Sequence, residues 1–192
     1  VPHLLFYGPP GTGKTSTALA LAHDLYGDEI VNRVMELNAS DQRGIEIVRQ
    51  KVKVFANMSV KSGDVPFKLI ILDEADSMTN EAQAALRRII ENTSRVTRFI
   101  FICNYVSRIT DPVMSRCIRC RFVPLSKPAI MGRLHHICAT ETCKAMDKDA
   151  LSTVTEACSG DLRKAVTILQ STVCQAVCSM DDVRDMAGFV PQ

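Results

Sequence analysis

Short apolar runs alternate with longer amphipathic segments through the N-terminal part of the chain. The runs are typical of buried strands, and we expect five of them, at Leu4–Tyr7, Arg33–Leu37, Phe67–Leu72, Arg98–Cys103 and Ile118–Phe122. Strands that alternate with helices at these spacings favour a parallel sheet covered on both faces. The pattern therefore predicts an α/β fold.

The segments between these runs have the periodicity of helices. An Ala- and Leu-rich helix is expected from Thr15 to Tyr26, with Gly27 as its stop signal. A second is expected from about Gly44 to Ala56, where apolar residues recur on one stripe. Thr79 can cap a third helix, which runs to about Glu91.

The pattern changes near residues 124–127. Pro124 and Pro128 interrupt the chain, and from Lys127 onward at least three helical patterns but no convincing strand follow. The clearest begins after Ser159-Gly160-Asp161. We expect an α/β nucleotide domain over residues 1–125 and a small helical domain over residues 126–192.

The stretch Gly8-Pro9-Pro10-Gly11-Thr12-Gly13-Lys14-Thr15 matches G-x-x-x-x-G-K-[ST] at every fixed position. Glycine lets successive backbone N–H groups turn toward one anion, and the following helix points its positive N-terminus at the phosphates. Lys14 supplies a mobile cation, and the Thr15 hydroxyl is a ligand for Mg²⁺. We predict an ATP and Mg²⁺ site whose nucleotide-binding residues are Gly8, Pro9, Pro10, Gly11, Thr12, Gly13, Lys14, Thr15 and Ser16.

A second chemical element follows the third predicted strand, where Leu69-Ile70-Ile71-Leu72 ends in Asp73-Glu74-Ala75-Asp76. This order places carboxylates at the carboxyl edge of the sheet, where α/β folds bind ligands. Asp73 fits an Mg²⁺ partner, directly or through water, and Glu74 fits the general base that activates water. Without the phosphate loop, the same acids could simply precede a helix as favourable negative charge.

Bulk composition narrows the function classes only loosely. A net charge of +2 with 23% charged residues excludes a strongly basic protein that coats nucleic acid. Any DNA contact would need a local patch of basic residues. No apolar run approaches the length of a membrane span, and Val1-Pro2-His3 lacks the charge pattern of a signal peptide. We expect an intracellular protein with no membrane partner.

Eight cysteines are scattered along the chain, which for an intracellular protein predicts reduced thiols. The one C-x-x-C pair is Cys117 and Cys120. Strand alternation places Ile118, Cys120 and Phe122 on one face and Cys117 on the other, so the pair is not expected to share a zinc ion.

These motifs together resemble the AAA+ ATPases and, more narrowly, the small subunits of replication factor C, the eukaryotic clamp loader. The stretches that carry the narrower resemblance are Leu5–Thr15, Glu36-Leu37-Asn38-Ala39-Ser40-Asp41, Leu72–Thr79 and Ser115-Arg116-Cys117. The resemblance implies a P-loop NTPase sheet of the AAA+ type followed by an all-α lid. It spans nearly the whole sequence.

The resemblance also implies catalytic roles for three more residues. Asn104 is similar to the sensor that orients the attacking water, and Arg163 to a second sensor on the helical domain that reaches the γ-phosphate. Arg116 is similar to an arginine finger, which acts in trans on the ATP of a neighbouring subunit. From the residues alone, Asn104 ends a strand and Arg163 is a solvated helix charge. If the resemblance holds, hydrolysis belongs to a subunit interface, and a lone chain is a poor ATPase.

Contact with primer–template DNA is implied for the helix from about Gly44 to Ala56. The candidate residues are Ser40, Arg43, Arg49 and Lys53, which could track phosphates without reading bases. An ordinary solvated helix face is the alternative. Gln83 and Arg87, one turn apart, could link this helix to Glu74 and suppress hydrolysis until DNA arrives.

The resemblance implies an ATP-driven clamp-loader subunit of the nucleus, which acts with other clamp-loader subunits in a hetero-pentamer and with a ring-shaped sliding clamp. Compared with that family, we expect a fragment that lacks part of the adenine pocket and the C-terminal collar. Two alternatives stay open. One is another AAA+ DNA remodeller, such as a helicase loader or branch-migration motor, and the other is a nucleotide-binding scaffold with little turnover.

Overall fold

The computed structural model describes residues 2–40, 45–58, 65–141 and 148–174. The chain divides into two compact units. The first comprises residues 1–8 and 14–122, and the second comprises residues 9–13 and 123–192. The predicted domain boundary at residues 125 and 126 lies near the change of unit, and as a division of function it stays a prediction.

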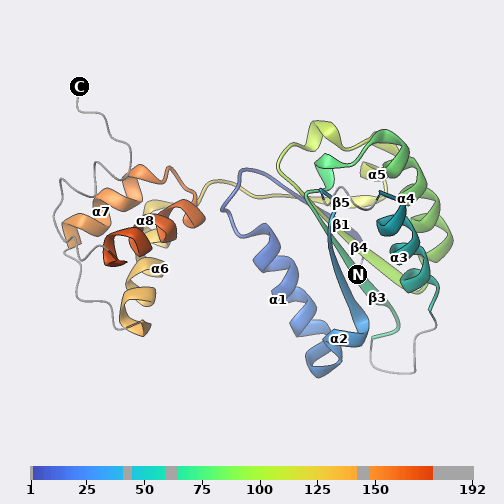
Figure 1. Ribbon diagram of the computed structural model, residues 1–192, viewed down its shortest axis with the longest axis horizontal. Helices are drawn as coiled ribbons and strands as arrows, with labels where there is room; N and C mark the ends of the chain where they lie inside the picture. Colours follow the sequence, from blue (N-terminus) through green and yellow to red (C-terminus); the bar gives the residue numbers. More distant parts are fainter. Residues whose placement is uncertain (1, 41–44, 59–64, 142–147, 175–192) are drawn as a thin grey trace. The chain divides into compact units, whose positions relative to one another are not determined.

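The first unit is built on a parallel sheet, as the alternating pattern predicted (Figure 1). Within the described residues its strands are β1 (His3–Tyr7), β2 (Val34–Asn38), β3 (Lys68–Asp73), β4 (Thr97–Cys103) and β5 (Cys117–Arg121). They lie side by side in the order β2-β3-β4-β1-β5, and every pairing is parallel. The five predicted strands are confirmed, with small shifts at their ends.

Helices and single helical turns connect these strands. Those described in the first unit are α1 (Lys14–Tyr26), η1 (Gly27–Glu29), α2 (Ile30–Arg33), α3 (Ile45–Asn57), η2 (Ala75–Ser77), α4 (Asn80–Thr93), η3 (Val106–Arg108) and α5 (Asp111–Met114). The predicted cap is present, since Thr79 Oγ1 accepts the Ala82 N–H at 3.3 Å. The expectation that Arg33 begins a strand was wrong. Arg33 ends α2, where its Nε lies 3.0 Å from Glu29 Oε2, one helical turn earlier.

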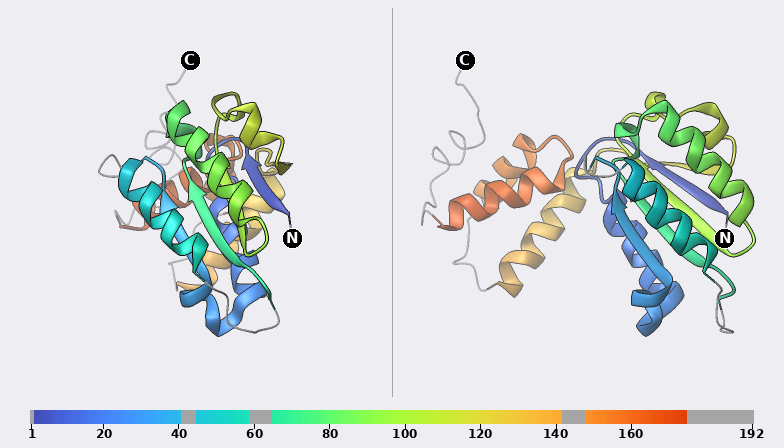
Figure 2. Two further views of the ribbon diagram at one scale, coloured as in Figure 1. Left: turned by 90° about the vertical axis from the view of Figure 1, so that its right-hand side faces the viewer. Right: turned by 45° about the vertical axis from the view of Figure 1, so that its right-hand side comes forward.

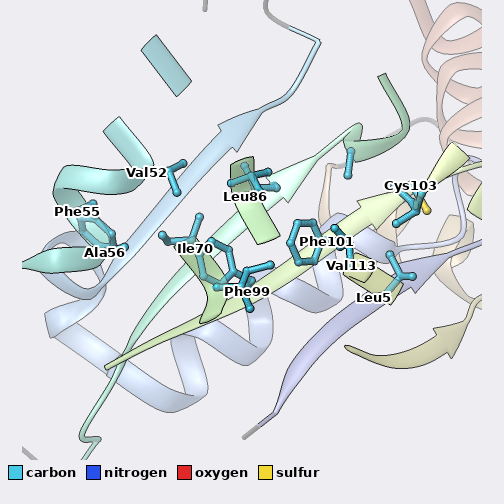
Figure 3. Packing of buried hydrophobic residues seen from close by; sticks show 14 residues of the cluster. Leu5, Val52, Phe55, Ala56, Ile70, Leu86, Phe99, Phe101, Cys103 and Val113 are labelled. Atoms are coloured by element: carbon cyan, nitrogen blue, oxygen red, sulfur yellow. The ribbon is translucent and has the colours of Figure 1, made fainter. Parts of the chain in front are cut away.

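The two faces of the sheet carry separate apolar cores. Helices α1 and α2 cover one face, and α3, α4 and α5 cover the other (Figure 1 and Figure 2). Phe99 and Phe101 point to the second face, where they pack with Leu5, Leu86 and Val113 (Figure 3). Because β1, β3 and β4 are buried on both faces, they read as continuous apolar runs rather than alternating ones.

The second unit contains the predicted helical region. Its described helices are α6 (Lys127–Thr140), α7 (Lys148–Ala157) and α8 (Leu162–Cys174), which share a core that includes Leu134, Val154 and Leu169. Asp161 Oδ1 accepts the Lys164 N–H at 3.0 Å and so caps α8 at the predicted start. None of the helices that the structure describes combines the length and the apolar character needed to cross a membrane.

Candidate functional site

The carboxyl edge of the sheet brings together three stretches that are far apart in the sequence. Strands β1, β3 and β4 end at Tyr7, Asp73 and Cys103, and the pairing register puts Tyr7 beside Cys103. Since the strands are parallel, the phosphate loop, the acidic motif and Asn104 all leave the sheet at one edge. This is the edge at which the sequence predicted a ligand site.

Lys14 links the phosphate loop to the fourth strand. Its side chain is nearly buried, with 7% exposure, and Nζ donates to the Gly8 carbonyl at 2.8 Å and to Asn104 Oδ1 at 2.9 Å. Lys14 and Asn104 are 90 residues apart, so the parallel pairing of β1 and β4 creates the contact. The fold therefore holds the Lys14 ammonium beside the Asn104 amide, and the roles of both residues toward a nucleotide stay predictions.

Thr15 and Asp73 form the second link across this edge. Thr15 Oγ1 donates to Asp73 Oδ2 at 2.7 Å. Mg²⁺ prefers oxygen ligands at about 2.0–2.1 Å in an octahedron, in which adjacent ligands are about 2.9 Å apart. Thr15 Oγ1 and Asp73 Oδ2 would suit Mg²⁺, held directly or through water. Among the described residues, no group of three or more His, Cys, Asp or Glu side chains is placed to hold a metal by itself.

Glu74 is held in an uncommon backbone conformation beside Asp73. Its φ of 52° and ψ of 38° lie in the left-handed region, which costs a non-glycine residue about 1 kcal/mol or more. The Glu74 N–H donates to Asp73 Oδ1 at 2.8 Å, and the Ser77 hydroxyl donates to the Glu74 carbonyl at 2.7 Å. These bonds stabilise the sharp turn after β3. The Glu74 side chain is exposed, and its role as general base stays a prediction.

The middle of the phosphate loop, residues 9–13, belongs to the second unit. The Leu162 N–H donates to the Gly11 carbonyl at 3.0 Å, so the start of α8 holds the loop backbone. Gly11 has a φ of 66°, and a Cβ there would lie 1.7 Å from Asp161 Oδ1. A side chain at this position would be strained by the positive φ and would require the Asp161 carboxylate to move, so glycine is favoured.

Arg163 lies in the first turn of α8 and is exposed. It belongs to the second unit, whereas Lys14, Thr15, Asp73 and Asn104 belong to the first. Its role as a second sensor stays a prediction.

Arg116 lies at the other edge of the sheet. It directly precedes β5, and the first β5 residue, Cys117, pairs with His3 at the start of β1. The length of β1, about 13 Å at 3.3 Å per residue, therefore separates this edge from the phosphate loop. The guanidinium contacts the Glu91 carboxylate and donates to the Pro112 carbonyl. Arg87 Nε also binds Glu91, at 3.2 Å.

A link from Gln83 to Glu74 stays a prediction. The Gln83 side chain bonds to the backbone on both sides, and one bond runs from Nε2 to the Met78 carbonyl at 3.4 Å, at the end of the turn that follows Glu74. Gln83 is buried, with 1% exposure, and Nε2 donates to the Arg108 carbonyl at 2.9 Å while Oε1 accepts the Thr110 N–H at 2.8 Å. These two bonds go to the backbone at the end of η3 and just before α5. In this structure Gln83 fastens α4 to that segment.

The predicted DNA residues are described only in part. Ser40 is exposed, and its N–H and hydroxyl both donate to Asn38 Oδ1 at 2.9 Å. Lys53 is exposed on α3. Arg43 and the side chain of Arg49 lie outside the described residues. DNA contact by these four residues stays a prediction.

The described cysteines near the sheet are buried or half-buried. Burial, reinforced by the Asp76 carboxylate and opposed by Lys14, raises the pKa of Cys103 to about 12. Burial likewise raises the pKa of Cys117 to about 11. Cys117 packs against one sheet core and Cys120 against the other, which is the predicted alternation. Protonated thiols are poor nucleophiles and poor metal ligands.

Sequence reasoning missed two acidic residues of this region. Asp76 Oδ2 accepts the N–H groups of Asn104 and Tyr105, at 3.2 and 3.0 Å. Glu91 is the ion-pair partner of Arg116. Asp76 stood within the acidic motif and had no role assigned to it. The contact of Glu91 with Arg116 had no sequence signal, because the two residues are 25 positions apart and the contact depends on the fold.

Comparison with protein families gives two matches. The family described as ATPase family associated with various cellular activities (AAA) matches residues 4–125. The RCF1/5-like AAA+ ATPase lid domain matches residues 132–174.

Curated relatives are similar over nearly the whole chain. Replication factor C subunit 4 of Arabidopsis thaliana is 52% identical, over 99% of this chain and 59% of the relative. Replication factor C subunit 4 of Homo sapiens is 50% identical, over 100% of this chain and 55% of the relative. The replication factor C small subunit of Sulfurisphaera tokodaii is 50% identical, over 98% of this chain and 57% of the relative. The chain thus spans less than two thirds of the length of these relatives.

Among solved structures, the Thermotoga maritima RuvB Holliday junction branch migration motor has a TM-score of 0.70. It shares 15% sequence identity, and the match covers 96% of this chain and 60% of that chain. At this identity the likeness concerns the fold alone.

Proposed function

The chain belongs to the AAA family of ATPases, and from this premise we propose that it is an ATP-binding and ATP-hydrolysing subunit of a DNA clamp loader. The observation that carries the nucleotide chemistry is the pair of contacts at the carboxyl edge of the sheet, Lys14 to Asn104 and Thr15 to Asp73. The assignment to a clamp loader is supported by relatives named as replication factor C subunits.

Each residue of the edge has a distinct task in the proposed reaction. Lys14 and the backbone N–H groups of the phosphate loop bind the phosphates, and Thr15 with Asp73 holds Mg²⁺, which neutralises phosphate charge. Asn104 orients the attacking water. Glu74 accepts the proton of that water as its oxygen bonds to the γ-phosphorus and ADP leaves. Arg163, which belongs to the second unit, binds the γ-phosphate as a second sensor.

Arg116 completes the site of a neighbouring subunit in this proposal. Its position at the amino edge of the sheet supports action in trans, because the phosphate loop of the same chain starts at the opposite edge. An arginine that stabilises the transition state from a neighbour makes hydrolysis depend on assembly.

The proposed partners are the other clamp-loader subunits of a hetero-pentamer, a ring-shaped sliding clamp and primer–template DNA, in the nucleus. With ATP bound, the assembly opens and holds the clamp and recognises the primer–template junction. Hydrolysis then releases the clamp on DNA. Exposed Lys53 on α3, together with Ser40, Arg43 and Arg49, supplies the phosphate contacts in this proposal.

Purification of the full-length protein from cell extract tests the assembly. Related subunits and a ring-shaped clamp should come with it, and the ATPase of that complex should rise when DNA and clamp are both present. Stimulation by DNA without any need for a clamp would favour another AAA+ remodeller. Full turnover in a Glu74→Gln complex would instead favour a scaffold whose nucleotide is structural.

A further inference from the structure

Asp76 is the last acid of the motif Asp73-Glu74-Ala75-Asp76, and the proposed reaction gives it no task. Its Oδ2 accepts hydrogen bonds from two successive backbone N–H groups, those of Asn104 at 3.2 Å and Tyr105 at 3.0 Å. These groups lie directly after the last residue of β4, Cys103. One carboxylate from the turn after β3 therefore binds the backbone of the segment that includes Asn104, the predicted sensor.

We propose that Asp76 is a positioning residue, which fixes the backbone after β4 so that the Asn104 side chain stays in register with Lys14. The inference rests on the proposed function, because it assigns Asp76 to the nucleotide site. The contacts form a chain of three residues: Asp76 holds the Asn104 N–H, and Asn104 Oδ1 accepts from Lys14 Nζ at 2.9 Å.

The end of β4 needs such an acceptor. Within the sheet, backbone N–H groups are paired by neighbouring strands, but Asn104 and Tyr105 lie beyond the register of β1 with β4, which ends at Cys103. A carboxylate that accepts two adjacent N–H groups forms charge-assisted bonds, which are stronger than neutral ones. A side chain placed there restricts the turn more than water would.

Asp76 is itself held firmly enough to act on a neighbour. It lies in η2, a turn closed by the bonds from Ser77 N–H to the Glu74 carbonyl at 2.9 Å and from Met78 N–H to the Ala75 carbonyl at 3.3 Å. Ala75 is fully buried in the sheet core and anchors this turn. Glu74, the proposed base, and Asp76, the proposed holder of the sensor, thus share one short turn.

Kinetics of the assembled complex test the role. Asp76→Ala should lower kcat by about tenfold to a hundredfold, as misplacement of a catalytic group does, with KM for ATP changed less than about twofold. Asp76→Asn keeps an acceptor oxygen and should recover most of kcat. The double variant Asp76→Ala with Asn104→Ala should be no slower than Asn104→Ala alone, because both act through one group. Glu81→Gln, an exposed carboxylate change at the start of α4, serves as the control.

Amide hydrogen exchange in the full chain gives a readout without turnover. Asp76→Ala should speed exchange at Asn104 and Tyr105 by about tenfold or more and leave the interior of α4 unchanged, whereas Asp76→Asn should change it little. Unchanged exchange at these amides, or additive effects in the double variant, would overturn the inference. If Glu74→Gln keeps full turnover, the proposed function fails. If Glu74→Gln and Asn104→Ala are slow but Asp76→Ala is not, only this inference fails.

Discussion

The Thr15 hydroxyl donates to the Asp73 carboxylate at 2.7 Å, although 58 positions separate the two residues in the sequence. Both oxygens suit Mg²⁺, so loss of either should weaken nucleotide binding only when the metal is present. Thr15→Val keeps the shape of the side chain and removes the hydroxyl. We expect it to lower the affinity for MgATP by about tenfold or more, as loss of a ligand or its outer-shell partner typically does.

Fluorescent-nucleotide titration with Mg²⁺ and with EDTA measures this effect. Thr15→Ser retains the hydroxyl and is the matched control, which should bind as the unchanged protein does. Equal loss of affinity for Thr15→Val in both buffers would instead indicate damage to the loop, and the assignment of Thr15 to the metal would be wrong.

Arg116 should be needed for turnover but not for nucleotide binding by its own chain. Its guanidinium lies at the amino edge of the sheet with Glu91, away from the phosphate loop that follows β1. Arg116→Ala should reduce ATPase of the assembled complex by about 10³-fold at the one site it completes, in line with other arginine fingers. Arg119→Ala, an exposed change on β5, is the control. Weakened ATP binding by the isolated Arg116→Ala chain would contradict action in trans.

Gln83 should contribute to stability through its buried amide. Nε2 and Oε1 bind the backbone of Arg108 and Thr110, at 2.9 and 2.8 Å, and the side chain is only 1% exposed. Gln83→Leu leaves both backbone groups without this partner, which should lower the free energy of unfolding of the first unit by about 1–3 kcal/mol.

Urea unfolding, followed by a probe in the first unit, measures this loss. Gln170→Leu, an exposed change on α8, is the control. An unfolding midpoint equal to that of the unchanged protein would mean that α4 is held without Gln83. Whether Gln83 links DNA binding to Glu74 needs a separate measurement, the DNA-stimulated ATPase of the assembled complex.

The strands were predictable because three of them are buried on both faces. Double burial makes β1, β3 and β4 continuous apolar runs, which stand out from amphipathic helices. Helix α2 was missed because its sequence shows no such pattern. It is only four residues long, too short to show a helical periodicity, and its last residue, Arg33, pairs with Glu29 just before its start.

The residues that meet at the carboxyl edge of the sheet could be identified where one local segment carries the motif, and their roles stay predictions. The phosphate loop and Asp73-Glu74 have fixed spacings, and the parallel sheet then brings them together. The contacts of Asp76 and Gln83, by contrast, are with backbone groups 28 and 27 residues away. Backbone N–H and carbonyl groups are the same in every residue, so no side-chain pattern marks their partners.

His3 should make stability depend on pH below neutrality. Its Nδ1 accepts the Phe99 N–H at 3.2 Å, and burial, reinforced by Arg98, lowers the pKa of His3 from 6.5 to about 4. Between these values the unfolded chain binds a proton that the folded chain excludes, so this contribution is present above about pH 6.5 and is lost as pH falls toward 4. Chemical unfolding at pH 7.5, above that window, and at pH 5, within it, measures the loss. The midpoint of the unchanged protein should fall more than that of His3→Gln, which keeps an amide acceptor without titrating. An equal fall in the unfolding midpoint of the two proteins between pH 7.5 and pH 5 would show that folding does not shift the pKa of His3.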